Sequence, residues 1–348
     1  MQRLLVMRAR RRTEILPGQA TRAFRGLINL KASTDMSTTA NETAAEAAKD
    51  RIALWAIFSI PLIWGIGFPL THNAVAQVDP GLYAFSRSLV ATLALLPFAL
   101  PYVAKANRRT VIGGLILGGF SALNIVSQSY ALSHLSSASA AFCVTLSIVF
   151  IPFVMLALRH GLPSRIDIAS VSIGLVGAYV FLGARLDSLN VGYAWGLTAA
   201  FAIAMNIGII GKLTAHQGGV NRLALAFFQI LFGTVALAYF PIRRPLEPLT
   251  HPQVWTAILF MGVMSTALAV VLQTRYQQRV GTARTSVIFN LDLVFASVFG
   301  LVNKEPLTIA QISGGVVLLL ASSLESVLGV IRKLLGKRPR DEASVSNS

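Results

Sequence analysis

The chain has 348 residues, of which 54% are hydrophobic and only 13% are charged, and its mean hydropathy is +0.65. A soluble domain has about 25% charged residues. Too few charges are therefore present to cover a water-facing surface, which excludes a soluble globular enzyme, a disordered protein and a nucleic-acid-binding domain. The formal net charge of +16 needs its own explanation, because a basic balance is also typical of proteins that bind nucleic acid.

Residues 1–51 differ in composition from the rest of the chain. The segment 1–34 carries seven arginines and a single acidic residue, Glu14. This pattern is typical of a basic, disordered tail and also of a transit peptide that directs import into an organelle. A third interpretation is that translation begins at Met36. We favour the tail and the later start equally, and both over the transit peptide.

Ten apolar runs of about 19–24 residues follow from residue 52 onward. At 1.5 Å per residue, each run can cross a hydrocarbon core of ~30 Å as a helix. Helices are expected because lipid offers backbone groups no hydrogen-bond partner. The sequence therefore predicts an all-α integral membrane protein with transmembrane helices near 52–71, 81–104, 110–130, 138–158, 166–184, 191–211, 222–240, 253–274, 284–302 and 307–330.

The basic residues between these runs are distributed unevenly. If the N-terminus is cytoplasmic, the cytoplasmic loops and the basic tail 331–348 hold fifteen Lys and Arg residues, whereas the outer loops hold four. Loops rich in Lys and Arg stay in the cytoplasm. The asymmetry predicts that both termini are cytoplasmic, and it explains the net charge without nucleic acid, because the basic loops face an anionic leaflet. A bacterial inner (plasma) membrane is the simplest location.

The fourth and ninth runs align without gaps at an offset of 145 residues. Residues 138–150 are ASAAFCVTLSIVF and residues 283–295 are ARTSVIFNLDLVF. Two halves of five helices each must enter the membrane from opposite sides, since five is odd. We therefore expect two inverted five-helix repeats, residues 52–184 and 191–330, an architecture that many secondary transporters use for alternating access around a midplane site.

Several segments carry a resemblance to a known family. The stretch SALNIVSQSYALSHLSSASAAFCVTLSIVFIPFVMLAL (121–158), together with WGIGFPL (64–70), FSRSLVATLALLP (85–97) and LDLVFASVFGLVNKEPLTIAQISGG (291–315), resembles the EamA family of the drug/metabolite transporter superfamily. The resemblance implies ten helices in two inverted repeats, a central cavity, peripheral fifth and tenth helices, and transport of small metabolites. The chain departs from the family pattern at Asp292-Leu293, where Glu-Pro is frequent, and at His160, where the first repeat often has a glutamate; the second repeat keeps Glu305.

Two charged residues lie inside predicted membrane helices. Asp292 is near the centre of the ninth run, where a lone carboxylate costs about 3 kcal/mol on insertion scales. It should therefore face a cavity or a partner, either as a proton, cation or substrate site or as a hydrogen-bonded structural group. Arg87 lies near the outer end of the second run. It is a candidate to bind a substrate carboxylate or phosphate, to pair with Asp292, or to extend to the outer interface.

Uncharged polar residues supply further pathway candidates. Ser121, Asn124 and Gln128 share one helix face in the third run, and such a face should point toward a cavity or another helix. For each single residue, a contact between helices is the more common role. The remaining candidates are Asn206, Gln229, Gln273 and Asn290, with Trp64 and Phe68 as apolar walls.

Prolines and glycines mark candidate hinges. The first run contains IPLIWGIGFP, in which Pro61 and Pro69 cannot donate backbone hydrogen bonds and Gly65 and Gly67 add flexibility. These residues predict either a bending helix or a static kink. Pro152 in the fourth run allows the same two interpretations.

The sequence contains no motif for a cofactor or a metal. The five histidines lie at or beyond the ends of the runs and show no ligand spacing, so we expect no metal site and no cofactor. The leading hypothesis is a secondary transporter that moves a small solute across the lipid bilayer, with protons as a candidate coupling ion. The alternatives are an intramembrane lipid-modifying enzyme and a non-transporting membrane scaffold. Both a monomer and a homodimer are compatible with the sequence.

Overall fold

The computed structural model describes residues 17–158, 165–182, 190–215, 219–244, 246, 249 and 251–334. By its internal contacts the chain divides into two units, Met1–Ile52 and Ala53–Ser348, and each is described by itself. Every regular element among the described residues is a helix.

The described part of the N-terminal unit belongs to the first part of α2 (Pro17–Val75). Here the structure differs from the expected disordered tail, because residues 17–51 are helical. Residues 40–49 include five alanines, and alanine has the highest helix propensity. Lys49 and Glu46, one turn apart, also form an ion pair with an Nζ–Oε1 distance of 2.6 Å.

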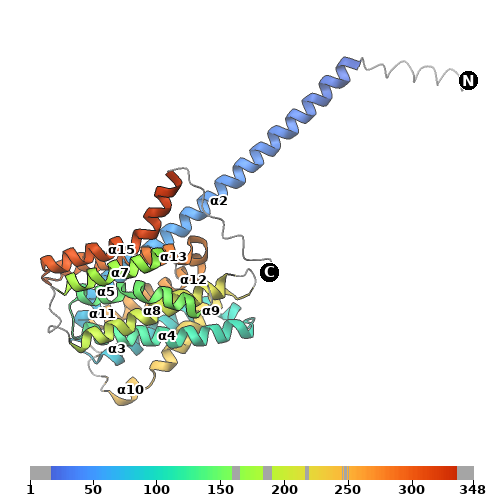
Figure 1. Ribbon diagram of the computed structural model, residues 1–348. Coiled ribbons are helices and arrows are strands. Elements are labelled where there is room, and N and C mark those ends of the chain that lie inside the picture. Colours follow the sequence, from blue (N-terminus) through green and yellow to red (C-terminus); the bar gives the residue numbers. More distant parts are fainter. Residues whose placement is uncertain are drawn as a thin grey trace, which may run out of the picture. The chain divides into compact units, whose positions relative to one another are not determined.

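The larger unit contains the rest of α2 and a bundle of further helices (Figure 1). These helices are α3 (Pro80–Val103), α4 (Arg108–Leu132), α5 (Ser137–Thr145), α6 (Ser147–Ala157), α7 (Arg165–Phe181), α8 (Val191–Thr214), α9 (Arg222–Leu237), α10 (Phe240–Arg243), α11 (Pro252–Phe260), η3 (Met261–Leu268), α12 (Ala269–Val280), α13 (Thr282–Phe289), α14 (Asp292–Val302) and α15 (Ile309–Leu334).

The apolar helical segments match the ten predicted runs. Among the described residues, eight segments are long and apolar enough to cross a membrane, and two shorter apolar helices, Ile168–Phe181 and Ile309–Ala321, occupy the fifth and tenth positions. The prediction of an all-helical integral membrane protein is confirmed, and the count of ten agrees once the two shorter helices are included.

Polar contacts gather the loops into two groups, one at each end of the bundle. At the first end, Asn73 bonds to Asn303, and the Glu305 carboxylate accepts hydrogen bonds from the Ser137 amide and hydroxyl at 2.6 and 2.7 Å. Other contacts at this end join Gln77 to Gln253, and Arg244 to Asp79. The second end is joined by bonds from Asn107 to Gly219, from Lys212 to Leu158 and from Arg222 to Arg275.

The two halves of the bundle run in opposite directions. α2 reaches the first end at its C-terminus, where the His72 ring bonds to the Leu132 carbonyl oxygen at 2.8 Å. α8, the first helix of the second half, starts at that same end, because Gly192 packs against Leu135, and it finishes at the second end with Lys212. This arrangement is an inverted repeat.

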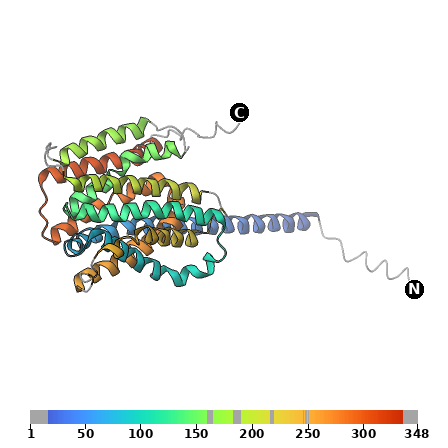
Figure 2. The same ribbon diagram turned by 90° about the horizontal axis from the view of Figure 1, so that it is seen from below.

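Helix pairing also follows the repeat. The second helix of each half packs against the third of the other half: α3 against η3, and α9 against α4. The first helix of each half contacts the fourth of the other, since Gly65 meets Phe295 and Gly208 meets Val154. The fifth and tenth helices, α7 and α15, pack on each other at one edge of the bundle (Figures 1 and 2).

The fourth and ninth membrane segments are each broken in the middle. α5 ends at Thr145 and α6 begins at Ser147, while α13 ends at Phe289 and α14 begins at Asp292. The restart residues Ser147 and Asp292 are 145 residues apart, which is the offset of the sequence repeat. The two halves therefore share this break.

The predicted hinge residues lie within continuous helices. Pro61, Gly65, Gly67 and Pro69 all belong to α2, and Pro152 belongs to α6 rather than to the break at Leu146. The glycines permit close packing, because a Cβ on Gly65 would overlap Phe295 and a Cβ on Gly67 would overlap Met261.

Candidate functional site

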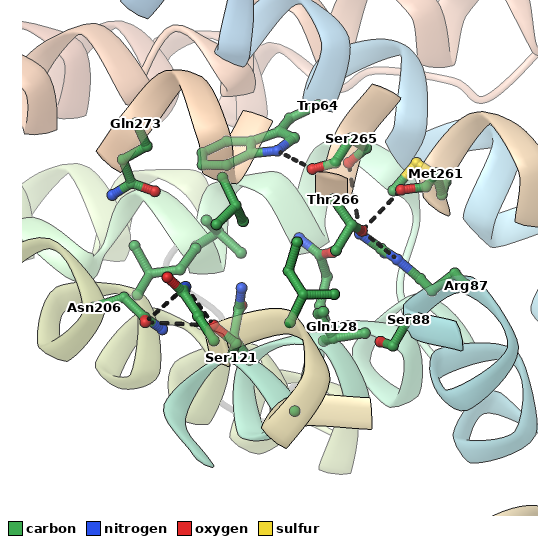
Figure 3. Close-up of a pocket in the computed structure, with 18 of the residues that line it drawn as sticks. Trp64, Arg87, Ser88, Ser121, Gln128, Asn206, Met261, Ser265, Thr266 and Gln273 are labelled. Atoms are coloured by element: carbon green, nitrogen blue, oxygen red, sulfur yellow. Dashed lines mark hydrogen bonds between the residues drawn. The ribbon is translucent and has the colours of Figure 1, made fainter. Parts of the chain in front are cut away.

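A polar cavity lies inside the bundle, between residues of both halves (Figure 3). Its volume is about 70 Å³, measured for the centres of water-sized molecules. One water needs about 10–15 Å³ by this measure, so there is room for about five waters or a small solute.

Ten of the eleven predicted pathway residues line this cavity. They are Trp64, Phe68, Arg87, Ser121, Asn124, Gln128, Asn206, Gln229, Gln273 and Asp292. They come from seven of the ten membrane segments, so the fold collects residues that are far apart in sequence. Asn290 is the exception: it is buried at the C-terminal end of α13 and does not line the cavity.

Arg87 is only 3% exposed and points into the bundle. Its guanidinium donates hydrogen bonds to the Thr266 hydroxyl, from Nε at 3.3 Å and from Nη2 at 3.1 Å, and to the Ser265 hydroxyl at 3.5 Å. Figure 3 shows these residues on one side of the cavity. Arg87 thus faces neutral hydroxyls rather than the outer interface, and it forms no ion pair with Asp292.

The hydroxyls that hold Arg87 belong to a π-helix, η3. The wider turn of this helix lets the Thr266 hydroxyl donate to the Met261 carbonyl oxygen, five residues back, at 2.8 Å. It also leaves the Ser265 carbonyl oxygen as acceptor for the Trp64 indole N–H at 3.1 Å. π-Helical turns frequently occur at functional sites, and here the turn aims two hydroxyls at one guanidinium.

Asp292 occupies the first turn of α14, at the break in the ninth segment, and is 2% exposed. The Thr145 hydroxyl, at the end of α5, donates a hydrogen bond to Asp292 Oδ1 at 3.4 Å. The two broken segments therefore meet beside the cavity. The N-terminal end of a helix carries partial positive charge, which favours a carboxylate in its first turn.

The wall opposite Arg87 carries uncharged amides and a hydroxyl among apolar side chains such as Ile203 and Ile207. Gln229 donates to the Ser121 hydroxyl at 2.7 Å and to Asn206 Oδ1 at 3.3 Å. Gln273 donates to Gln277, which in turn donates to the Ile207 carbonyl oxygen. In Figure 3, Ser121 and Asn206 lie across the cavity from Arg87.

Several buried polar atoms of the cavity have no protein partner. They are Arg87 Nη1, Ser88 Oγ, Asn124 Oδ1 and Gln229 Oε1. Buried polar groups in proteins are nearly always hydrogen-bonded to protein or to water. These four atoms therefore indicate a site that holds water or a polar solute.

Three hydroxyl-bearing residues beside Arg87 were not predicted from the sequence. Ser88, Ser265 and Thr266 line the cavity, but single hydroxyls are common in membrane helices and usually bond to their own backbone. The one available signal was the Ser265–Thr266 pair, which interrupts an otherwise apolar stretch. Among the described residues, no group of three His, Cys, Asp or Glu side chains could hold a metal ion.

The amino-acid sequence matches the model of the EamA-like transporter family twice, over residues 51–183 and 190–326. The chain belongs to the EamA-like transporter family. The family assignment favours a membrane transporter over an enzyme.

Two further comparisons agree with this assignment. A protein of Archaeoglobus fulgidus that bears the name "uncharacterized transporter" is 25% identical over 302 residues, covering 86% of this chain and 94% of that protein. A crystal structure of a protein superimposes with a TM-score of 0.58 over 82% of this chain and 99% of the other, at 18% identity. That likeness supports the fold alone.

Proposed function

We propose that the protein is a secondary transporter of small metabolites that works by alternating access around the central cavity. The observation that carries this proposal is the cavity itself, which places a guanidinium and a carboxyl inside a bundle of apolar helices. Ionisable residues at membrane depth are costly and usually mark a solute or ion pathway.

The inverted halves supply a mechanism. The broken fourth and ninth segments meet beside the cavity through Thr145 and Asp292, and discontinuous helices form the solute sites of many transporters built from inverted repeats. One half rocks against the other and opens the cavity to each side in turn. The distribution of basic loop residues supports cytoplasmic termini, and a bacterial inner membrane is the simplest location for the protein.

In this scheme Arg87 binds the solute, and Asp292 exchanges a proton or contacts the solute from the opposite half. A carboxyl can accept and release a proton, whereas a guanidinium keeps its charge. Proton coupling through Asp292 therefore requires only that its carboxyl be open to the same side of the membrane as the cavity, first to one side and then to the other.

The test begins with an untargeted comparison of metabolites in medium and cells, with and without the gene. Solutes whose distribution changes are then measured in proteoliposomes, with and without a pH gradient, for wild type, Asp292→Asn and the exposed control Asp50→Asn. We expect flux in wild type and in the control, and a loss of at least tenfold in Asp292→Asn. Absence of flux for every solute would refute transport, and unchanged flux and pH response in Asp292→Asn would remove this residue from the mechanism.

A further inference from the structure

The charge of the cavity restricts the solute, if the protein is the transporter proposed above. Of the described residues that line the cavity, only Arg87 and Asp292 have ionisable side chains. A guanidinium remains protonated in proteins, while a carboxyl is either neutral or carries one negative charge. The net charge of the lining is therefore +1 or 0 and is never negative.

Among the residues that the structure describes, Arg87 has no anionic partner. Its three hydrogen bonds all go to neutral hydroxyls, and Nη1 has no partner although it is buried. A buried charge is costly unless it is paired. An oxyanion in the cavity would supply both the missing charge and an acceptor for Nη1.

Asp292 is better compensated than Arg87. It receives a hydrogen bond from Thr145 and lies in the first turn of α14, where the helix end favours negative charge. It can also become neutral by protonation. The positive charge of Arg87 is therefore less well compensated than the carboxyl of Asp292, which favours an anionic solute over a cationic one.

The opposite wall selects for the uncharged part of the solute. Asn124 Oδ1 and Gln229 Oε1 are buried without partners among the described residues, and so is Ser88 Oγ, which lies beside Arg87 on α3. Carboxamides offer both a donor and an acceptor, so they match hydroxyl or amide groups on a solute. Leaving them against a purely apolar body would cost their hydrogen bonds.

We propose that the solute is a small organic oxyanion, a carboxylate or a phosphate, whose short body carries hydroxyl groups and which has no net positive charge. Arg87 binds the oxyanion, and the facing amides of Asn124 and Gln229 bind the hydroxyls. The cavity, at about 70 Å³, suits a molecule the size of glycerate or glycerol phosphate.

Calorimetric binding to the purified, detergent-solubilised protein tests this proposal without relying on transport. The probes are glycerate, threonate and glycerol phosphate, with propionate (no hydroxyls), glycerol (no anion) and ethanolamine (a cation) as matched comparisons. We expect at least one hydroxylated anion to bind at least tenfold more tightly than all three comparison compounds. Which of them binds distinguishes a carboxylate from a phosphate solute.

Two variants locate the binding. Arg87→Gln should lower the affinity for the anion by roughly 10- to 100-fold, since a charge-assisted hydrogen bond is lost. Arg108→Gln, a substitution of an exposed residue at the start of α4, should leave the affinity unchanged. Asn124→Leu removes an amide whose Oδ1 has no hydrogen-bond partner among the described residues. It should reduce the preference for glycerate over propionate and leave the fold intact, as checked by thermal unfolding.

The failure of this inference differs from the failure of the transport proposal. If ethanolamine or glycerol binds most tightly, if none of the hydroxylated anions binds, or if Arg87→Gln binds as wild type does, the solute class is wrong, even where proteoliposomes show flux of another solute. Tight binding of a hydroxylated anion without any flux would instead support the site and refute transport.

Discussion

At the scale of single residues, the buried guanidinium of Arg87 needs hydrogen-bond partners to offset the cost of removing its charge from water. It is buried at 3% exposure and is held by two hydroxyls of η3. Thr266 serves it twice, accepting hydrogen bonds from both Nε and Nη2. The orientation of Arg87 therefore depends on Thr266, which also lines the cavity.

Replacing Thr266 by valine tests this dependence, because valine keeps the shape and removes the hydroxyl. Two hydrogen bonds from a charged group are lost, and each contributes about 1.5–3 kcal/mol to stability. We expect a lower free energy of unfolding by at least about 1.5 kcal/mol, and weaker binding of any solute held by Arg87. Thermal unfolding and calorimetry measure the two effects.

Thr256→Val is the matched control for this change. Thr256 lies in the same membrane segment but is exposed, and its hydroxyl bonds to the Pro252 carbonyl oxygen of its own helix. It should change stability by less than about 0.5 kcal/mol, as is usual for surface substitutions. Equal effects of the two valines would mean that Thr266 does not hold Arg87.

The charged members of the site were predictable from the sequence, whereas their partners were not. Arg87 and Asp292 stand out because a charge inside an apolar run has few explanations. Ser265 and Thr266 act through the π-helical turn, and nothing in MGVMSTAL identifies such a turn. Asn290, the one candidate that does not line the cavity, is buried at the C-terminal end of α13, before the break that precedes Asp292.

At the scale of helices, close packing between α4 and α9 holds Ser121 and Gln229 in place on the cavity wall opposite Arg87. Gly118 lets α4 approach α9, since a Cβ there would lie 2.8 Å from the Phe232 Cβ and 2.9 Å from the Gln229 carbonyl oxygen. Gly119, the next residue, has open space around it. Substituting Gly118 and Gly119 in turn therefore separates the effect of helix contact on stability from the effect of helix propensity.

Gly118→Ala should therefore destabilise the protein, and Gly119→Ala should not. The added methyl must push the two helices apart, which typically costs about 1–3 kcal/mol. At Gly119 the same change only improves helix propensity, by up to about 1 kcal/mol. Thermal unfolding of both variants measures the difference, and a Gly118→Ala variant as stable as Gly119→Ala would contradict this account of the α4–α9 contact.

Hydrophobicity predicted the helices but not their interruptions. Each of the ten runs contains a helical segment in the structure, because burying apolar length in lipid decides where a membrane helix lies. The break at Leu146 contains neither glycine nor proline, so local preference gives no signal for it. Pro152, the residue that did suggest a hinge, is accommodated within α6.

At the scale of the whole molecule, the inverted repeat follows from simple counting. After five crossings the chain is on the side of the membrane opposite to the one from which it started. The loop contacts agree with this, because Asn73 bonds to Asn303 at one end of the bundle and Asn107 bonds to Gly219 at the other. The sequence repeat was visible only around the break of the fourth and ninth segments. Elsewhere the halves share helix pairing rather than residues.

Cysteine labelling of the protein expressed in bacteria tests the proposed orientation of this arrangement. Cys143 is the only cysteine and is 1% exposed, so Cys143→Ala gives a background without reactive thiols. Into it are placed single exposed cysteines by Ala76→Cys, Lys105→Cys and Gln278→Cys. Because Lys and Arg concentrate on the cytoplasmic side, a membrane-impermeant maleimide should label Ala76→Cys in intact cells, and Lys105→Cys and Gln278→Cys only in inverted vesicles.

Labelling of Lys105→Cys and Gln278→Cys from opposite sides would contradict the inverted fold itself, whereas a reversal of all three would contradict only its orientation.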